Sequence, residues 1–314
     1  MIQRMLKISP FIFLVLMGQI FFPLFFTLQL RHIAQHDIVA WILSLYIAGS
    51  YAAFIFLVGA WSWFGKVTRF ALPVILVVVA VATYPYDHAD VTVSTWLAVE
   101  PIISIGVGTI FTFVLVQALL GRRLSTPALE LAFPLHGGTY YVAQGGSTRI
   151  VNIHRMSPSQ RYALDVLKLN EIGLRALGLY PADPKRYSIF GSEVASPCDG
   201  VVAAAEDGFI DLSPPERDPE HRAGNYVAIE SDGATIYLAH LMKGSLCVKS
   251  GEHICKGQML GRVGNSGNTT EPHLHIHAEE GSYPGHFSGK RSIPMRFNGR
   301  FLVRNDRVKV PVQE

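Results

Sequence analysis

Four long apolar stretches lie within the first 120 residues, and no comparable stretch follows them. Each is long enough, or nearly long enough, to cross a hydrocarbon core of about 30 Å as a helix. They account for a hydrophobic fraction of 49% and a mean hydropathy of +0.28, both high for a soluble protein. The sequence therefore predicts a membrane domain over residues 1–120, with spans at Phe11–Leu30, Ile38–Ala60, Phe70–Tyr86 and Pro101–Leu120.

The first stretch follows two basic residues, Arg4 and Lys7, as a signal peptide does. Its length, the absence of a small-x-small cleavage site and the three further spans favour a retained helix instead. Few polar residues occur in the spans, and Gln19, Gln29 and Glu100 are the candidates for inward-facing groups. No charged pair suggests transport. We expect an anchor in the lipid bilayer.

After Leu120 the composition of the sequence changes to segments rich in glycine, proline and β-branched residues, separated by turn signals. This composition is typical of an all-β domain. We predict a linker over 121–130, a β-domain over 131–282 and a C-terminal tail over 283–314. Ser231-Asp232-Gly233 predicts a hairpin turn, and Asn298-Gly299 predicts a second hairpin in the tail. Further strands are expected at 140–142, 149–151 and 162–167.

A strand is also predicted where histidines alternate with aliphatic residues, in the stretch Glu271-Pro272-His273-Leu274-His275-Ile276-His277. Successive side chains on a strand point to opposite faces, so three imidazoles share one face. Leu274 and Ile276 then turn into a core, which fixes the register of the strand. Three histidines are more than a merely polar face needs, and they indicate a metal or proton-transfer site.

Charge and cysteine content exclude some classes of protein. The net charge is only +3, which gives no case for binding nucleic acid. The three cysteines, Cys198, Cys247 and Cys255, are too few and too widely spaced for a disulfide framework or a zinc knuckle, although one Cys247–Cys255 bridge stays possible.

A catalytic zinc ion needs three protein ligands and one open position. Asp165 lies in an otherwise apolar predicted strand, and a carboxylate there needs a metal or a polar partner unless it is a surface residue. His275 is a candidate ligand on the histidine strand. His240 and His273 are the candidates for taking up and returning protons.

These residues resemble peptidase family M23, the lysostaphin and LytM-like zinc metallopeptidases. The resemblance spans roughly residues 131–281 and rests on a series of short motifs in a fixed order, Ala195–Val202, Gly224–Ile229, Tyr237–Leu241, Val248–Glu252, Gly257–Gly261 and Gly264–His275. It implies a β-sandwich of the duplicated-hybrid-motif type. It also implies a zinc endopeptidase acting on peptides, usually those of peptidoglycan, with His275 as a zinc ligand and His240 and His273 as the catalytic pair.

The chain departs from the usual family pattern at one ligand. The family presents His-x-x-x-Asp, whereas Arg161 stands four residues before Asp165, and a guanidinium cannot ligate zinc. Some relatives resemble Asn152-Ile153-His154 followed by Gln160–Asp165, which makes His154 the expected third ligand. His277 is a reserve ligand, a partner behind the ligands or a surface residue.

Alternatives to a membrane-anchored zinc peptidase stay open. Arg161 motivates a metal-poor regulatory or binding module of the same fold, and Ser196–Gly200 also resembles a sugar phosphotransferase carrier.

Lysines and arginines near the span ends predict that the domain after Arg123 lies in the cytoplasm, because basic residues favour that side. Peptidoglycan lies outside a plasma membrane, so the family's usual substrate argues for the other side.

Overall fold

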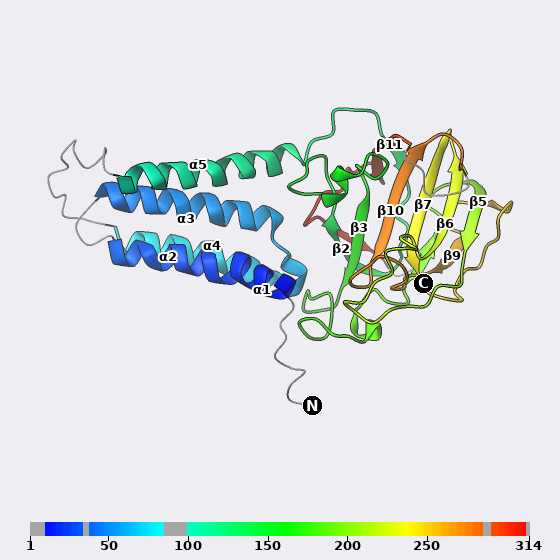
Figure 1. The fold of residues 1–314 in the computed structure, drawn as a ribbon, viewed down its shortest axis with the longest axis horizontal. Coiled ribbons are helices and arrows are strands. Elements are labelled where there is room, and N and C mark those ends of the chain that lie inside the picture. The colour runs from blue at the N-terminus through cyan, green and yellow to red at the C-terminus, as the bar shows by residue number, and fades with distance from the viewer. Residues whose placement is uncertain (1–9, 34–37, 85–98, 285–289, 312–314) are drawn as a thin grey trace. The chain divides into compact units, whose positions relative to one another are not determined.

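The chain divides into two compact units. The structure is a computed structural model that describes residues 10–33, 38–84, 99–284 and 290–311 (Figure 1). The first unit is Met1–Leu119 and the second is Leu120–Glu314. The segment 85–98, which lacks lysine and arginine and enters the prediction of membrane side, falls outside the described residues.

The first unit is helical. Four of its helices are long and apolar enough to cross a membrane, over Phe13–Leu30, Ile38–Val58, Gly65–Ala82 and Pro101–Leu120. The first runs through α1 (Pro10–Leu16), a π-helical turn (Met17–Phe21) and α2 (Phe22–Ile33); the others are α3 (Ile38–Val58), α4 (Gly65–Ala82) and α5 (Val99–Leu120). Helix α4 begins five residues before the predicted span at Phe70, and these added residues include the polar Lys66, Thr68 and Arg69.

Polar groups within the helical unit serve its own packing. The Gln19 side chain is buried, and its Oε1 accepts a hydrogen bond from the backbone N–H of Ala60 at 2.8 Å. The hydroxyl of Tyr51 donates to the carbonyl of Gly18 at 2.6 Å. These bonds satisfy backbone groups at the π-helical turn and at the end of α3, as an apolar surrounding requires.

The second unit is built on one nine-stranded sheet (Figure 1). Its strands follow the order β13-β2-β3-β10-β7-β6-β5-β8, and β11 also pairs with β10. Two small sheets, β1 with β12 and β4 with β9, accompany it. The strand bounds are β1 Leu129–Leu131, β2 Gly138–Gln144, β3 Leu164–Leu169, β4 Glu193–Ala195, β5 Gly200–Glu206, β6 Asn225–Ser231, β7 Ala234–Leu241, β8 His253–Ile254, β9 Met259–Arg262, β10 Leu274–Glu280, β11 Ser292–Ile293, β12 Met295–Phe297 and β13 Arg307–Val310.

The histidine strand forms as β10, but it begins at Leu274, so His273 lies just before the strand and not within it. Leu274 and Ile276 on β10 are fully buried in the apolar core, and β10 lies between β3 and β7. The predicted hairpin also forms, because β6 and β7 pair up to Ser231 and Ala234, and Asp232 and Gly233 between them take positive φ angles of 50° and 72°. Such angles suit an Asp-Gly turn.

One predicted strand and one predicted hairpin differ from the structure. Residues 149–151 form a turn in which the N–H groups of Val151 and Asn152 both donate to the carbonyl of Thr148, so this segment has no strand pairing. In the tail, the turn at Asn298-Gly299 forms, but β12 pairs with β1 and β13 pairs with β2. The tail strands therefore complete the sheets of the β-unit instead of pairing with each other.

Candidate metal centre

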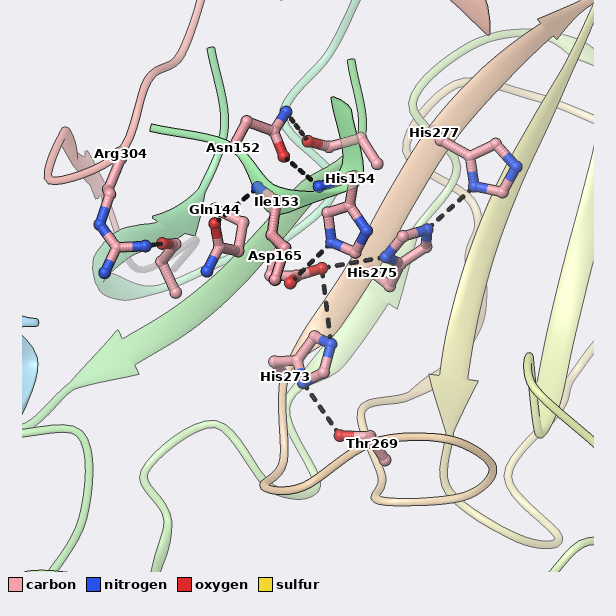
Figure 2. Close-up of polar contacts among 12 residues, drawn as sticks. Gln144, Asn152, Ile153, His154, Asp165, Thr269, His273, His275, His277 and Arg304 are labelled. Atoms are coloured by element: carbon pink, nitrogen blue, oxygen red, sulfur yellow. Dashed lines mark hydrogen bonds and ion pairs between the residues drawn. The ribbon is translucent and has the colours of Figure 1, made fainter. Parts of the chain in front are cut away.

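Strand pairing brings Asp165 and His275 together. In the antiparallel pair of β3 and β10, Asp165 is the direct partner of His275. Side chains in directly opposed positions lie on the same face of the sheet, about 5 Å apart at Cβ. The Nδ1 atom of His275 lies 2.9 Å from Oδ1 of Asp165 (Figure 2).

His154 reaches this pair from a short 3₁₀ helix over Ile153–Met156, which Asn152 fastens to the sheet. The buried Asn152 amide donates from Nδ2 to the carbonyl of Ala163 at 3.0 Å, just before β3, and its Oδ1 accepts from the N–H of His154 at 3.1 Å. Nε2 of His154 then lies 2.9 Å from Oδ2 of Asp165 (Figure 2). The Asn-x-His pattern thus has a structural cause, since the asparagine positions the histidine.

Two further histidines lie beside this cluster. His273 precedes β10, and its Nε2 lies 3.5 Å from Oδ1 of Asp165. His240 lies near the end of β7 with a φ of 63°, rare for a residue other than glycine, and its ring centroid is 4.8 Å from that of His273. Possible ligand atoms lie within 4.8 Å of one another in two groups, His154 with Asp165 and His275, and His240 with His273 and His275.

Both of these additional imidazoles have a fixed tautomer when neutral. Nδ1 of His240 lies 2.9 Å from the carbonyl of Ser266, and Nδ1 of His273 lies 2.8 Å from the carbonyl of Glu271. A carbonyl only accepts, so each Nδ1 carries a proton and each Nε2 keeps its lone pair. The lone pairs face the cluster, where they can accept a proton.

The electrostatics of the cluster favour a cation between its members. Burial alone would raise the pKa of Asp165. The charges of His154 and His273 and the hydrogen bonds from His154 and His275 act in the opposite direction, and together they hold the pKa of Asp165 well below its usual range. Burial acts to lower the pKa of His154, and the Asp165 charge overrides it in the upward direction. Burial lowers the pKa of His275 to about 3 and that of His240 well below its usual value.

These residues fit a zinc ion. Two imidazole nitrogens and one carboxylate are a usual ligand set for a catalytic zinc, which keeps a fourth position for water or substrate. An ionised aspartate and a neutral histidine are the protonation states that a metal requires. The side chains of His154, Asp165 and His273 are 19%, 13% and 14% exposed, so one side of the cluster is open to solvent.

His277 lies behind the cluster and is fully buried, which contradicts the prediction of a surface residue. Its Nδ1 lies 3.0 Å from Nε2 of His275 (Figure 2). Its Nε2 lies 3.5 Å from Oε1 of the buried Glu279, and its ring stacks on that of Tyr237 with the two centroids 4.7 Å apart. His275 points its other nitrogen, Nδ1, at Asp165. The predicted role as a partner behind the ligands agrees with this geometry. Sequence reasoning did not identify Glu279, although it continues the alternation of the histidine strand.

Arg161 does not enter the cluster. Its side chain is exposed and lines a separate pocket, while its carbonyl accepts a hydrogen bond from Asn152.

The loop over 170–190 contacts the segment before His273. In it, the buried Arg175 donates to Glu271 at 2.8 Å, and the hydroxyl of Tyr180 donates to the carbonyl of Thr270.

Comparisons with known proteins agree with this description. Residues 188–285 match peptidase family M23, which covers His240, His273 and His275. Peptidoglycan DD-endopeptidase ShyA of Vibrio cholerae is 28% identical over 180 residues, 54% of this chain and 39% of that protein. ShyC, a peptidoglycan DD-endopeptidase of the same organism, is 33% identical over 99 residues, 31% of this chain and 21% of that protein.

Among solved structures, a zinc-containing peptidase from Vibrio cholerae is similar with 23% identity and a TM-score of 0.24, covering 37% of this chain and 46% of that one. The chain spans less than half of the length of the curated relatives it matches. The β-rich unit of this protein contains a peptidase family M23 domain over residues 188–285.

Proposed function

We infer that this protein is a zinc metalloendopeptidase anchored in a membrane by its four apolar helices. The observation that carries the inference is the convergence of Nε2 of His154, the Asp165 carboxylate and Nδ1 of His275 beside two imidazoles with inward lone pairs. The first three residues are the proposed metal ligands. His240 and His273 are the proposed catalytic pair.

The chain's own residues supply proton transfer. Zinc held by the three ligands would acidify water and polarise a peptide carbonyl. Nε2 of His240 or of His273 accepts the proton that the attacking water loses, and the resulting imidazolium stabilises the negative charge that develops on the carbonyl oxygen. The same pair returns a proton to the leaving amine. The carbonyls of Ser266 and Glu271 hold both rings in the tautomer that this requires.

The proposed substrate is a peptide of the peptidoglycan type. Family M23 and two relatives named as peptidoglycan DD-endopeptidases support this substrate. The loop over 170–190 and the loop over 207–224 both contact the turn that leads into β10, through Tyr180 to Thr270 and through Asp218 to Gly267. These loops are therefore the proposed determinants of which peptide is accepted.

The test uses the full chain purified in a mild detergent. Zinc per chain is measured by atomic spectrometry, and hydrolysis of cross-linked peptidoglycan fragments is followed by mass spectrometry. Alanine in place of His154, Asp165 or His275 is expected to abolish stoichiometric zinc. His273→Gln is expected to keep zinc and to lose hydrolysis by about 100-fold or more, the usual contribution of a general acid or base.

His253→Ala is the matched control, because His253 is an exposed histidine on β8 outside the cluster. It should change neither zinc content nor hydrolysis. Full zinc occupancy in Asp165→Ala would contradict the proposed ligand set. A wild-type chain that binds no zinc would favour the metal-poor regulatory module instead.

A further inference from the structure

A basic pocket lies in the β-unit outside the candidate metal centre. Its volume is about 680 Å³. Four of its lining residues are cationic, Arg155, Arg161, Lys290 and Arg291, against one acidic residue, Glu280. The net charge of these five side chains is +3. Such a concentration of guanidinium and ammonium groups suits a phosphate or carboxylate.

The 3₁₀ helix that supplies Arg155 to this pocket also exposes apolar side chains. Ile153 is 59% exposed and Met156 is 65% exposed, and both lie within the same turn of helix as Arg155. Exposed aliphatic residues beside basic ones are the combination that sits at a bilayer surface, where apolar groups enter the acyl boundary and cations meet headgroups.

The pocket lies where the chain enters the β-unit. The carbonyls of Gly121 and Arg123 accept hydrogen bonds from Ser147, from its N–H at 2.9 Å and from its hydroxyl at 2.7 Å respectively. Asn152 donates to the carbonyl of the neighbouring Gly146, which ties this entry point to the 3₁₀ helix.

Chain length also limits how far the pocket can lie from the last apolar helix. Thr126 and Pro127 line the pocket. They follow the end of α5 at Leu120 by six and seven residues, which is at most roughly 25 Å of extended chain.

We propose that this pocket binds the phosphate headgroup of an anionic phospholipid, with Ile153 and Met156 inserted among the acyl chains beside it. The proposal rests on the membrane anchoring in the proposed function, and is independent of zinc and hydrolysis. The exposed apolar pair and the short tether to α5 favour a lipid over a soluble peptide, because a peptide carboxylate requires neither.

The position of His154 gives this contact a consequence for substrate choice. His154 immediately precedes Arg155 in the 3₁₀ helix, so a lipid held in the pocket keeps the candidate metal centre close to the bilayer surface. Peptides presented near the headgroups are then the accessible substrates.

Native mass spectrometry of the full chain, released from a mild detergent after delipidation, tests the proposal. Dioctanoyl phosphatidylglycerol is expected to bind as one molecule per chain, at least tenfold more tightly than dioctanoyl phosphatidylcholine. The double variant Arg155→Gln with Arg161→Gln should weaken phosphatidylglycerol binding by about 30-fold, since each basic residue at a membrane surface contributes about fivefold. Phosphatidylcholine binding should not change.

Matched variants keep the result interpretable. Arg186→Gln with Arg300→Gln removes the same charge from two exposed arginines outside the pocket and should leave both affinities unchanged. Arg155→Lys with Arg161→Lys keeps the charge and should retain binding within a few fold, which separates the role of charge from damage to the fold.

Several outcomes would overturn the proposal. They are equal binding of the two lipids, an equal loss in both glutamine double variants, binding of inorganic phosphate as tight as that of phosphatidylglycerol, and displacement of the lipid by a peptide ending in D-alanine. The last result would assign the pocket to a substrate carboxylate. A chain that lacks zinc yet prefers phosphatidylglycerol would contradict the proposed peptidase and support the lipid site.

Discussion

His277 is predicted to set the zinc affinity of the candidate centre without touching the metal. His275 can offer Nδ1 as a ligand only when its proton is on Nε2. In the structure that Nε2 lies 3.0 Å from Nδ1 of His277, whose own Nε2 faces Glu279. Without zinc, Nδ1 of His275 donates to the Asp165 carboxylate; when a metal takes Nδ1, the His275 proton is on Nε2 and His277 is its acceptor. Replacing it with phenylalanine keeps a ring to stack on Tyr237 and removes the acceptor.

The magnitude follows from the hydrogen bond that is lost. Without zinc, His275 carries its proton on Nδ1 and donates to Asp165 in the variant as in the wild type, so no buried donor is left unpaired. Zinc binding at Nδ1 requires the proton to be on Nε2, which in the variant has lost its partner on a ring that is only 4% exposed. An unsatisfied buried donor costs about 1–3 kcal/mol. This converts to a loss of zinc affinity of roughly 5- to 150-fold, which overlaps the usual effect of removing such a partner.

The assay is a competition for zinc between the full chain in detergent and a fluorescent chelator. Cobalt substitution in the same variant should leave the absorption spectrum of a four-coordinate site, because the ligand set is intact. His253→Phe serves as the control for adding phenylalanine at a histidine position. Unchanged affinity in His277→Phe would refute the role of the His275 contact. Complete loss of zinc at saturating concentration would instead make His277 a ligand.

Three further predictions concern stability and topology. Arg175→Met should lower the free energy of unfolding by about 3 kcal/mol or more, because it leaves Glu271 without its buried partner; thermal unfolding in detergent measures this. Acidifying the zinc-free chain from pH 7 to pH 5 should lower the free energy of unfolding by about 2 kcal/mol through His275 alone. The pKa of His275 is about 3 in the fold and 6.5 in the unfolded chain, so the stability present above pH 6.5 is lost as the pH falls. Denaturant midpoints at the two pH values measure this, and they would not differ through His275 if its ring were already protonated in the fold. The charge pattern predicts that the exposed Cys247 resists a membrane-impermeant maleimide in intact cells and reacts after permeabilisation, and that result would exclude mature peptidoglycan as the substrate; labelling without permeabilisation would reverse the predicted orientation and put the β-unit on the side where peptidoglycan lies.

The alternation of histidine and aliphatic residues was sufficient to predict β10, the strand that carries His275 of the candidate metal centre. A shift of one residue would exchange Leu274 and Ile276 with the histidines, so the apolar core leaves one register for β10. The same reasoning identified Asp165, because a carboxylate within an apolar strand needs a polar partner. The Asp232-Gly233 turn was equally predictable, since its positive φ angles favour those residue types.

Long-range pairing was not predictable from local patterns. Strand β12 pairs with β1 more than 160 residues away along the chain, and no local signal indicates this partner. The segment 149–151 has the composition of a strand, but its N–H groups are satisfied within a turn around Thr148. The burial of His277 likewise depends on Tyr237 from a neighbouring strand, which the sequence of β10 alone does not reveal.

The substitution of Arg161 for the usual family histidine does not require a degenerate site. A metal ion responds to where ligand atoms converge and not to the spacing of residues along the chain. Asn152 bonds to the carbonyl of Ala163 and to the N–H of His154, and so brings a histidine eleven residues before Asp165 to within 2.9 Å of its carboxylate. Position 161 is thereby released from ligation, and its exposed guanidinium lines the basic pocket beside Arg155. The Asn152-Ile153-His154 motif thus completes the candidate metal centre from the 3₁₀ helix, and Arg161 stays on the surface as one of the cationic residues of the basic pocket.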